Sequence, residues 1–160
     1  MAKAKKDNPK QPPSTVNKKA FHNFELLERF EAGISLTGSE VKSLRAAQAD
    51  LDGSYARIEG GECWLVGAKI AAYEQAGIYN HDPDRKRKLL IHKAEMRKIR
   101  AKLDQRGYTL VPLKIYFNQR GLAKAELALA KGKRQFDKRD SIMKRDQRRD
   151  MDRETKRYHK

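Results

Sequence analysis

Hydrophobic and polar residues alternate with a period of two in two segments of this chain, residues 21–34 and residues 122–130. Within residues 21–34, Phe24, Leu26 and Phe30 fall on one side of the alternation, and charged residues fill most of the other side. This period predicts a strand that ends in a turn at Gly33, with a helix as the rival interpretation.

A second pair of segments shows strand character in the C-terminal half of the chain. Residues 108–118 are rich in β-branched and aromatic side chains, and the Gln-Arg-Gly sequence at 119–121 leads into residues 122–130. In that last segment Ala and Leu alternate with Lys124 and Glu126. Propensity alone favours a helix there, but the period of two and the expected pairing with the preceding segment favour a strand.

A glycine pair and a capping pattern mark further elements between these strands. The glycines at 60–61 separate residues 55–58 from residues 63–70. Because paired glycines accept positive φ angles, this spacing predicts a hairpin. Thr37 and Glu40 have the capping-box spacing, in which each side chain can satisfy a free backbone N–H group, and they predict a short helix.

Two basic segments also carry helix signals. Asp82 and Pro83 offer an N-cap and a proline at the first helical position, so the basic residues after them are expected to form a helical turn. Residues 93–105 carry apolar side chains every three or four positions and predict a longer helix that stops at Gly107.

The pattern as a whole predicts a mainly β fold with inserted helices. About six strands in a domain of roughly 110 residues suit a small antiparallel β-barrel, which would remove the edges of the sheet. We divide the chain into a disordered basic N-terminal extension at 1–15, a β-barrel domain at 16–131 and a basic C-terminal tail at 132–160.

Charge narrows the class of partner. Lys and Arg outnumber Asp and Glu by 37 to 21, which gives a net charge of +16. Nucleic acid is the partner that such a charge favours. The chain has no apolar run long enough to span a bilayer. Its basic N-terminal residues are not followed by the apolar segment of a secretion signal, so we expect a cytoplasmic protein with no membrane partner.

Few residues suggest catalysis. Cys63 is the lone cysteine and is expected to be a small buried hydrophobe in a strand. The four histidines have no metal-ligand spacing, and no Gly-rich phosphate loop occurs. We therefore expect no catalytic residue, no metal, no cofactor and no small-molecule substrate.

The C-terminal residues have a composition of their own. Residues 131–160 hold thirteen Lys or Arg and six Asp or Glu. Acids precede bases at helical spacing, as Asp140 precedes Lys144, and a thin apolar stripe recurs about every two turns. A narrow stripe cannot offset an ordering cost of roughly 1–2 kcal/mol per residue, so we expect a tail that is disordered alone and helical with a charged partner. A solvated extension with no role is the alternative.

Six ordered motifs closely resemble the SsrA-binding protein family (small protein B). They are NKKA at 17–20, FEAGI at 30–34, GSEVKSLR at 38–45, RKLLI at 87–91, GYTLVPL at 107–113 and AKGKRQFDKR at 130–139. The match runs in order from residue 17 to about residue 149, and six motifs with compatible spacing are far more specific than any one of them.

The resemblance implies a β-barrel similar to an oligonucleotide-binding (OB) fold and a non-enzymatic partner of transfer-messenger RNA in bacterial ribosome rescue. Such a protein binds the tRNA-like part of that RNA and accompanies it into stalled ribosomes. A basic ribosomal or ribosome-assembly protein would share the charge and the barrel, and it is the first alternative. An RNA-modifying or RNA-cleaving enzyme is the second.

The resemblance also suggests RNA-binding residues. Asn17, Glu31 and Leu90 fall on family positions implicated in binding transfer-messenger RNA, and His22 lies in the same opening segment. From the residues alone, Asn17 could cap a turn, Glu31 could be a solvated acid and Leu90 could be core. Candidates for phosphate contacts, chosen by charge and placement with a merely solvated face as the alternative, are Lys42, Arg45, Arg85, Arg87, Lys88 and Lys124.

In this family the tail becomes helical inside the ribosome, along the vacant messenger channel and near the decoding region of the small-subunit rRNA. Gly132 is a candidate joint between barrel and tail, and Phe136 could stack on an rRNA base where many relatives carry His or Tyr. The tail residues expected to engage the ribosome are Gly132, Lys133, Arg134, Phe136, Asp137, Lys138, Arg139, Met143, Lys144 and Arg145.

Overall fold

The structure is a computed structural model, and it describes residues 14–133 together with residues 143, 147 and 151. The strands are β1 (Thr15–Val16), β2 (Phe24–Ile34), β3 (Ala49–Asp50), β4 (Tyr55–Glu59), β5 (Glu62–Val66), β6 (Lys69–Ile70), β7 (Arg87–Leu90), β8 (Tyr108–Phe117) and β9 (Ala123–Gly132). The helices are α1 (Lys18–Asn23), α2 (Gly38–Arg45), α3 (Lys93–Leu103) and the 3-10 segment η1 (Glu74–Tyr79).

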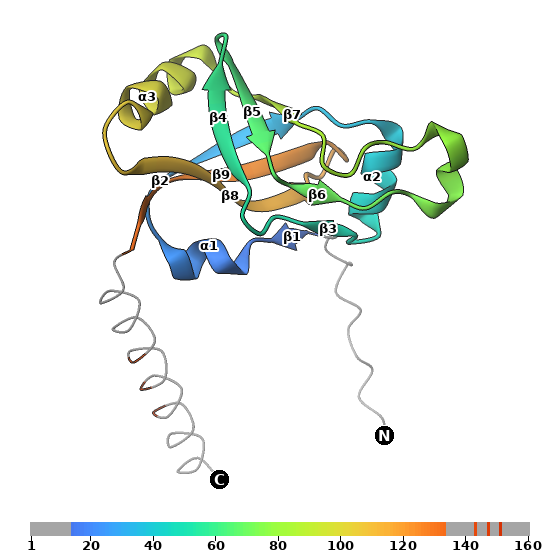
Figure 1. Cartoon of the computed structure of the whole chain (residues 1–160), viewed down its shortest axis with the longest axis horizontal. Coiled ribbons are helices and arrows are strands. Elements are labelled where there is room, and N and C mark those ends of the chain that lie inside the picture. Colours follow the sequence, from blue (N-terminus) through green and yellow to red (C-terminus); the bar gives the residue numbers. More distant parts are fainter. Residues whose placement is uncertain (1–13, 134–142, 144–146, 148–150, 152–160) are drawn as a thin grey trace.

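Antiparallel pairing joins most strands into one curved sheet (Figure 1). The strand order is β1-β8-β4-β5-β7-β2-β9, and β9 also pairs with β8. Six strands therefore form a closed cycle of pairings, with β1 added at β8 and a separate β3–β6 pair beside it. This arrangement confirms the mainly β fold with inserted helices and is compatible with an OB-like barrel.

Apolar side chains from the alternating strands fill the interior. Leu65, Leu110 and Leu127 are fully buried, and Ile99 brings α3 onto the same core. Cys63 is also fully buried on β5, as expected for a small hydrophobe, and burial raises the pKa of its thiol to about 11.

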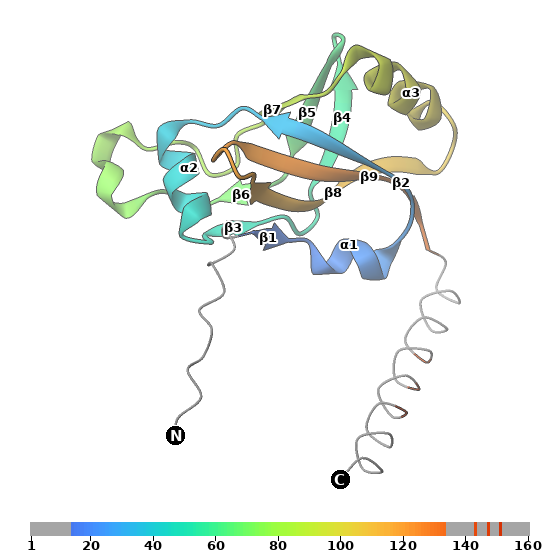
Figure 2. The ribbon, with the colours of Figure 1, turned by 180° about the vertical axis from the view of Figure 1, so that it is seen from behind.

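The helices α2 and α3 lie at opposite ends of the sheet in both views (Figures 1 and 2). The predicted capping box is present in α2: the Glu40 side chain accepts from the Thr37 N–H at 2.7 Å. The strand interpretation of residues 122–130 is confirmed, because β9 pairs along its length with both β2 and β8. The long strands β2 and β8 supply hydrogen-bond partners for the backbone of β9. A helix propensity, which depends on the segment alone, does not include them.

Several predicted boundaries were wrong. The strand interpretation for residues 21–34 holds only from Phe24, because α1 occupies the residues before it. Gly33 lies within β2, paired with Leu90, and is not in a turn. The predicted strand at 63–70 is two strands, β5 and β6, separated at Gly67, which has φ +75. The strand signals were correct, but pairing with distant strands set where each strand begins and ends.

The helical turn predicted after Asp82 and Pro83 is absent. Residues 83–84 form a turn, and the chain then enters β7, which pairs with β5 and β2. The helix predicted for 93–105 ends at Leu103, and Gly107, with φ +88, precedes β8. No helix in the described part of the chain is long and apolar enough to cross a membrane.

Candidate nucleic-acid interface

A groove runs between the end of β7, the neighbouring part of β2 and the start of α3. We call it the Leu90 groove; its volume is about 420 Å³. Glu31 and Lys124 line it from β2 and β9, while Lys88 and Leu90 line it from β7. Residues far apart in the sequence therefore form one surface, and four of the predicted RNA-binding residues lie on it.

Leu90 is exposed, with 55% of its surface accessible, because the pleat of β7 sends successive side chains to opposite faces. Its neighbour Leu89 is 1% exposed and belongs to the core. Leu90 lies over Gly33, where an added Cβ would come within 3.2 Å of the Leu90 Cβ. The glycine thus lets an apolar side chain lie close to β2 at the surface, and the alternative of Leu90 as ordinary core is wrong.

Glu31 is held in place by two neighbouring side chains. The Tyr116 hydroxyl donates a hydrogen bond to one carboxylate oxygen, and the Lys124 ammonium lies 3.1 Å from the other. These contacts lower the pKa of Glu31, and the same hydrogen bond raises the pKa of Tyr116 to about 12. The groove therefore presents an ionised carboxylate in a fixed orientation.

Lys88 and Lys124 are the two phosphate candidates that the structure brings into the groove. Lys88 forms an ion pair with Glu62 beside the Leu90 side chain. His92 and Lys93, at the start of α3, also line the groove.

Asn17 and His22 lie outside this groove. Asn17 is 6% exposed; its side-chain oxygen accepts from the Ala20 N–H at 3.0 Å, and its amide donates to the carbonyls of Leu51 and Pro112. These bonds cap α1 and tie it to the loop at Leu51 and to β8 at Pro112, so the capping alternative accounts for Asn17. His22 is half-buried at the end of α1, with Nδ1 3.2 Å from the Asn23 side chain.

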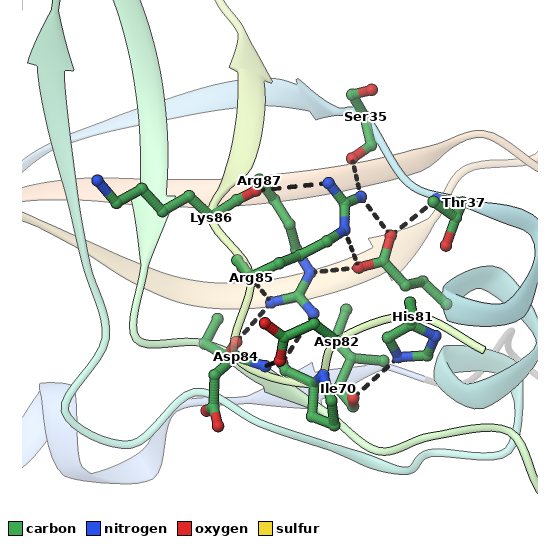
Figure 3. Close-up of polar contacts among 12 residues, drawn as sticks. Ser35, Thr37, Ile70, His81, Asp82, Asp84, Arg85, Lys86 and Arg87 are labelled. Atoms are coloured by element: carbon green, nitrogen blue, oxygen red, sulfur yellow. Dashed lines mark hydrogen bonds and ion pairs between the residues drawn. The ribbon is translucent and has the colours of Figure 1, made fainter.

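Arg87 is not available to an RNA phosphate, because its side chain is fully buried. Its Nε donates to Glu40 at 2.8 Å, and its Nη atoms donate to backbone carbonyls, including that of Ala68 at 2.5 Å (Figure 3). Arg85 holds the same carboxylate with two bonds of 2.7 and 2.6 Å and is about one-third exposed. Two of the four basic residues at 85–88 thus belong to the ion cluster around Glu40, whereas Lys88 lines the Leu90 groove.

Lys42 and Arg45 lie on α2, away from the Leu90 groove. Each places its cation over an aromatic ring: the Lys42 ammonium is 5.2 Å from the Tyr73 centroid, and the Arg45 guanidinium is 5.4 Å from that of Phe117. Both residues are exposed. They form a separate basic area, and their contact with phosphate stays a prediction.

Comparisons with known proteins identify the family of this chain. A family profile described as "SmpB protein" matches residues 14–157. The chain belongs to the SmpB protein family. An SsrA-binding protein of Symbiobacterium thermophilum is 50% identical to it over 151 residues, covering 94% of each chain. Another, from Thermus thermophilus, is 55% identical over 127 residues, covering 79% of this chain and 88% of its own.

A solved structure also matches this member of the SmpB family. It is described as "tmRNA-SmpB: a journey to the center of the bacterial ribosome", and it is 52% identical with a TM-score of 0.67. The match covers 81% of this chain and 94% of that chain. The resemblance seen in the six sequence motifs is therefore confirmed.

Sequence reasoning missed Tyr116 in this SmpB family member. Tyr116 pairs with Lys124 across β8 and β9, and its hydroxyl reaches Glu31. Had the register of these strands been known, the alternation would have placed Tyr116 and Lys124 side by side. Lys114, whose ammonium lies 4.8 Å from the Tyr116 ring centroid, was missed for the same reason.

Most of the predicted tail residues lie outside the described residues. They are Arg134, Phe136, Asp137, Lys138, Arg139, Lys144 and Arg145. Gly132 is the last residue of β9, and the Lys133 N–H donates to the Asn23 carbonyl at 3.0 Å. Met143 is helical and exposed.

Proposed function

We propose that this protein binds the tRNA-like domain of transfer-messenger RNA and delivers it to stalled ribosomes for trans-translation. The Leu90 groove is the observation that carries this assignment for the described residues. It combines an apolar side chain, an oriented carboxylate and lysines, which together suit the exposed bases and phosphates of a folded RNA. The family match and the tmRNA-SmpB structure support the choice of RNA.

The protein acts by binding and not by catalysis. A general base works best with a pKa near the working pH, whereas the contacts of Glu31 move its pKa further below that range. Glu62, the other acid of the groove, is paired with Lys88. The carboxylates thus serve as acceptors for base amino groups or as orienting partners for cations. The proposed partners place the protein in the bacterial cytoplasm.

The basic tail completes the proposal. Its residues from 132 onward engage the vacant messenger channel and the decoding region, where cations can follow rRNA phosphates. The thirteen cations of residues 131–160 support this role.

Competition between RNAs tests the proposed function. Charge alone would bind any structured RNA, so we expect transfer-messenger RNA to compete at least about tenfold better than an rRNA fragment of equal length at physiological salt. The measurement is displacement of labelled transfer-messenger RNA from the full-length protein. Equal competition by the two RNAs would favour the ribosomal or assembly protein instead.

Leu90→Ala is expected to weaken binding of transfer-messenger RNA several-fold while leaving stability nearly unchanged. The side chain is more than half exposed, so its removal should cost about 0.5 kcal/mol or less of unfolding free energy. Leu89→Ala is the matched control, because a buried Leu→Ala change costs about 2–5 kcal/mol. Binding titrations and thermal melts measure both effects.

Wild-type affinity in Leu90→Ala would contradict the assignment of this side chain to the interface. A loss of stability in Leu90→Ala as large as that in Leu89→Ala would show that Leu90 acts through the fold. Glu31→Ala is expected to weaken binding as well, and because Glu31 is exposed, its effect too should appear in binding and not in the melt.

A further inference from the structure

A second groove lies between α3 and the turn of the β4–β5 hairpin. In Figure 1 the helix lies beside the tip of that hairpin. We call it the α3 groove; its volume is about 420 Å³, and it is lined by Ile58, Gly61, Lys93, Met96, Arg97 and Arg100. Gly61, Lys93 and Met96 also line the Leu90 groove, so the two grooves are continuous.

The α3 groove is more positive than the Leu90 groove. Lys93, Arg97 and Arg100 follow one another at i, i+4 and i+7, which places them on one face of the helix. Among the residues that the structure describes, no acid lines this groove, whereas two glutamates offset three lysines in the Leu90 groove. We therefore expect each cation of the α3 groove to contribute more to phosphate binding than each lysine of the Leu90 groove.

The three cations are exposed and have no ion-pair partner among the residues that the structure describes. Lys98, on another face of α3, is different, because its ammonium pairs with Glu28. The cations of the groove can thus contact an incoming anion without first breaking an internal salt bridge.

The floor of the groove is apolar. Ile58 and Met96 are half-buried and pack against the core. Gly61 adds open space, because an added Cβ there would meet nothing within 4 Å. An apolar floor with a cationic rim suits one or more unstacked nucleotides, whose bases contact the floor while their phosphates meet the cations.

We propose that the α3 groove binds a base-and-phosphate segment of the same RNA molecule that occupies the Leu90 groove. This inference rests on the proposed function and extends its footprint across the β4–β5 turn. Continuity with the Leu90 groove is the reason to assign both to one RNA. An rRNA segment is the other source of the same chemistry, and the experiment below separates the two.

The test compares two double variants of the full-length protein that lose the same charge from the same helix. Arg97→Gln with Arg100→Gln removes two cations of the groove, and Lys98→Gln with Lys102→Gln removes two cations that do not line it. Affinity for the isolated tRNA-like domain is measured across a series of salt concentrations. Trans-translation is measured alongside, as the tagging of stalled protein chains on the ribosome.

For the groove variant we expect about tenfold weaker binding at physiological salt. We also expect a log K against log salt slope that is shallower by about 1.5–2, as for two lost phosphate contacts. The Lys98/Lys102 control should stay within about twofold of wild type. Arg97→Lys with Arg100→Lys should keep most of the salt slope, because charge is preserved. All four side chains are exposed, so thermal melts should be unchanged.

The inference is overturned if the groove variant binds the tRNA-like domain with wild-type affinity and slope, or if it differs no more than the control. Normal binding of the free RNA with reduced tagging would assign the groove to rRNA, which also overturns it. Failure of wild type to prefer transfer-messenger RNA over an unrelated RNA is a separate result, since that outcome removes the proposed function itself.

Discussion

Glu40→Gln is expected to lower the free energy of unfolding by about 3–5 kcal/mol, because it leaves the fully buried Arg87 without a counter-charge. Both side chains are inaccessible to solvent, and Arg85 holds the same carboxylate from the surface side. Chemical denaturation at pH 7 measures the loss. Glu126→Gln is the control: its partner Arg29 is 60% exposed, so we expect a change of about 0–1 kcal/mol.

The same cluster predicts a dependence of stability on pH. Burial alone would raise the pKa of Glu40, but hydrogen bonds from Arg85, the Thr37 backbone and Arg87 outweigh it and lower the pKa from 4.5 to about 2. A lowered folded-state pKa means that this contribution is fully present above about pH 4.5 and is lost as the pH falls toward 2.

The stability difference between wild type and Glu40→Gln should therefore shrink between pH 5 and pH 2, a window that the two pKa values of Glu40 define. Denaturation curves at several pH values give this difference directly. A difference that does not change with pH would mean that Glu40 titrates alike in the folded and unfolded states.

Local patterns predicted the elements whose reason for forming is local. The capping box at Thr37 and Glu40 identified α2 because its two hydrogen bonds lie within one turn. The alternation in β2 and β9 identified strands because one face of each packs on the core. The number of strands already predicted a small antiparallel β-barrel, and the family motifs then added its resemblance to an OB fold.

Long-range partners account for what the sequence did not reveal. Arg87 follows a run of charged residues and looks like a surface cation, yet Glu40, 47 positions earlier, pairs with it inside the protein. Leu89 and Leu90 look alike in the sequence, and only the pairing of β7 with β2 and β5 decides which one is buried. The groove that contains Leu90 depends on the same pairing.

Truncation after Gly132 is expected to leave binding of the tRNA-like domain nearly intact and to abolish tagging of stalled chains. β9 ends at Gly132, so all strands of the sheet are retained, together with the Leu90 groove. The removed residues carry all twelve cations of the tail at 132–160, which are proposed to follow rRNA phosphates. Titration with the tRNA-like domain and a tagging assay on stalled ribosomes measure the two activities.

A tail that works as a helix and a tail that works as a flexible polycation differ in their response to proline. Lys144 lies outside the described residues, between Met143 and Gln147, which are both helical. Lys144→Pro removes one of the twelve cations in the tail at 132–160 but costs a helix roughly 3 kcal/mol, so it should stop tagging if the tail must be helical on the ribosome. Lys144→Gln loses the same charge and should be tolerated, because glutamine is a good helix former. Normal tagging by the proline variant would show that tagging requires the charge of the tail and not its helix. Loss of RNA binding on truncation would show that RNA binding and tagging are not divided between barrel and tail as proposed.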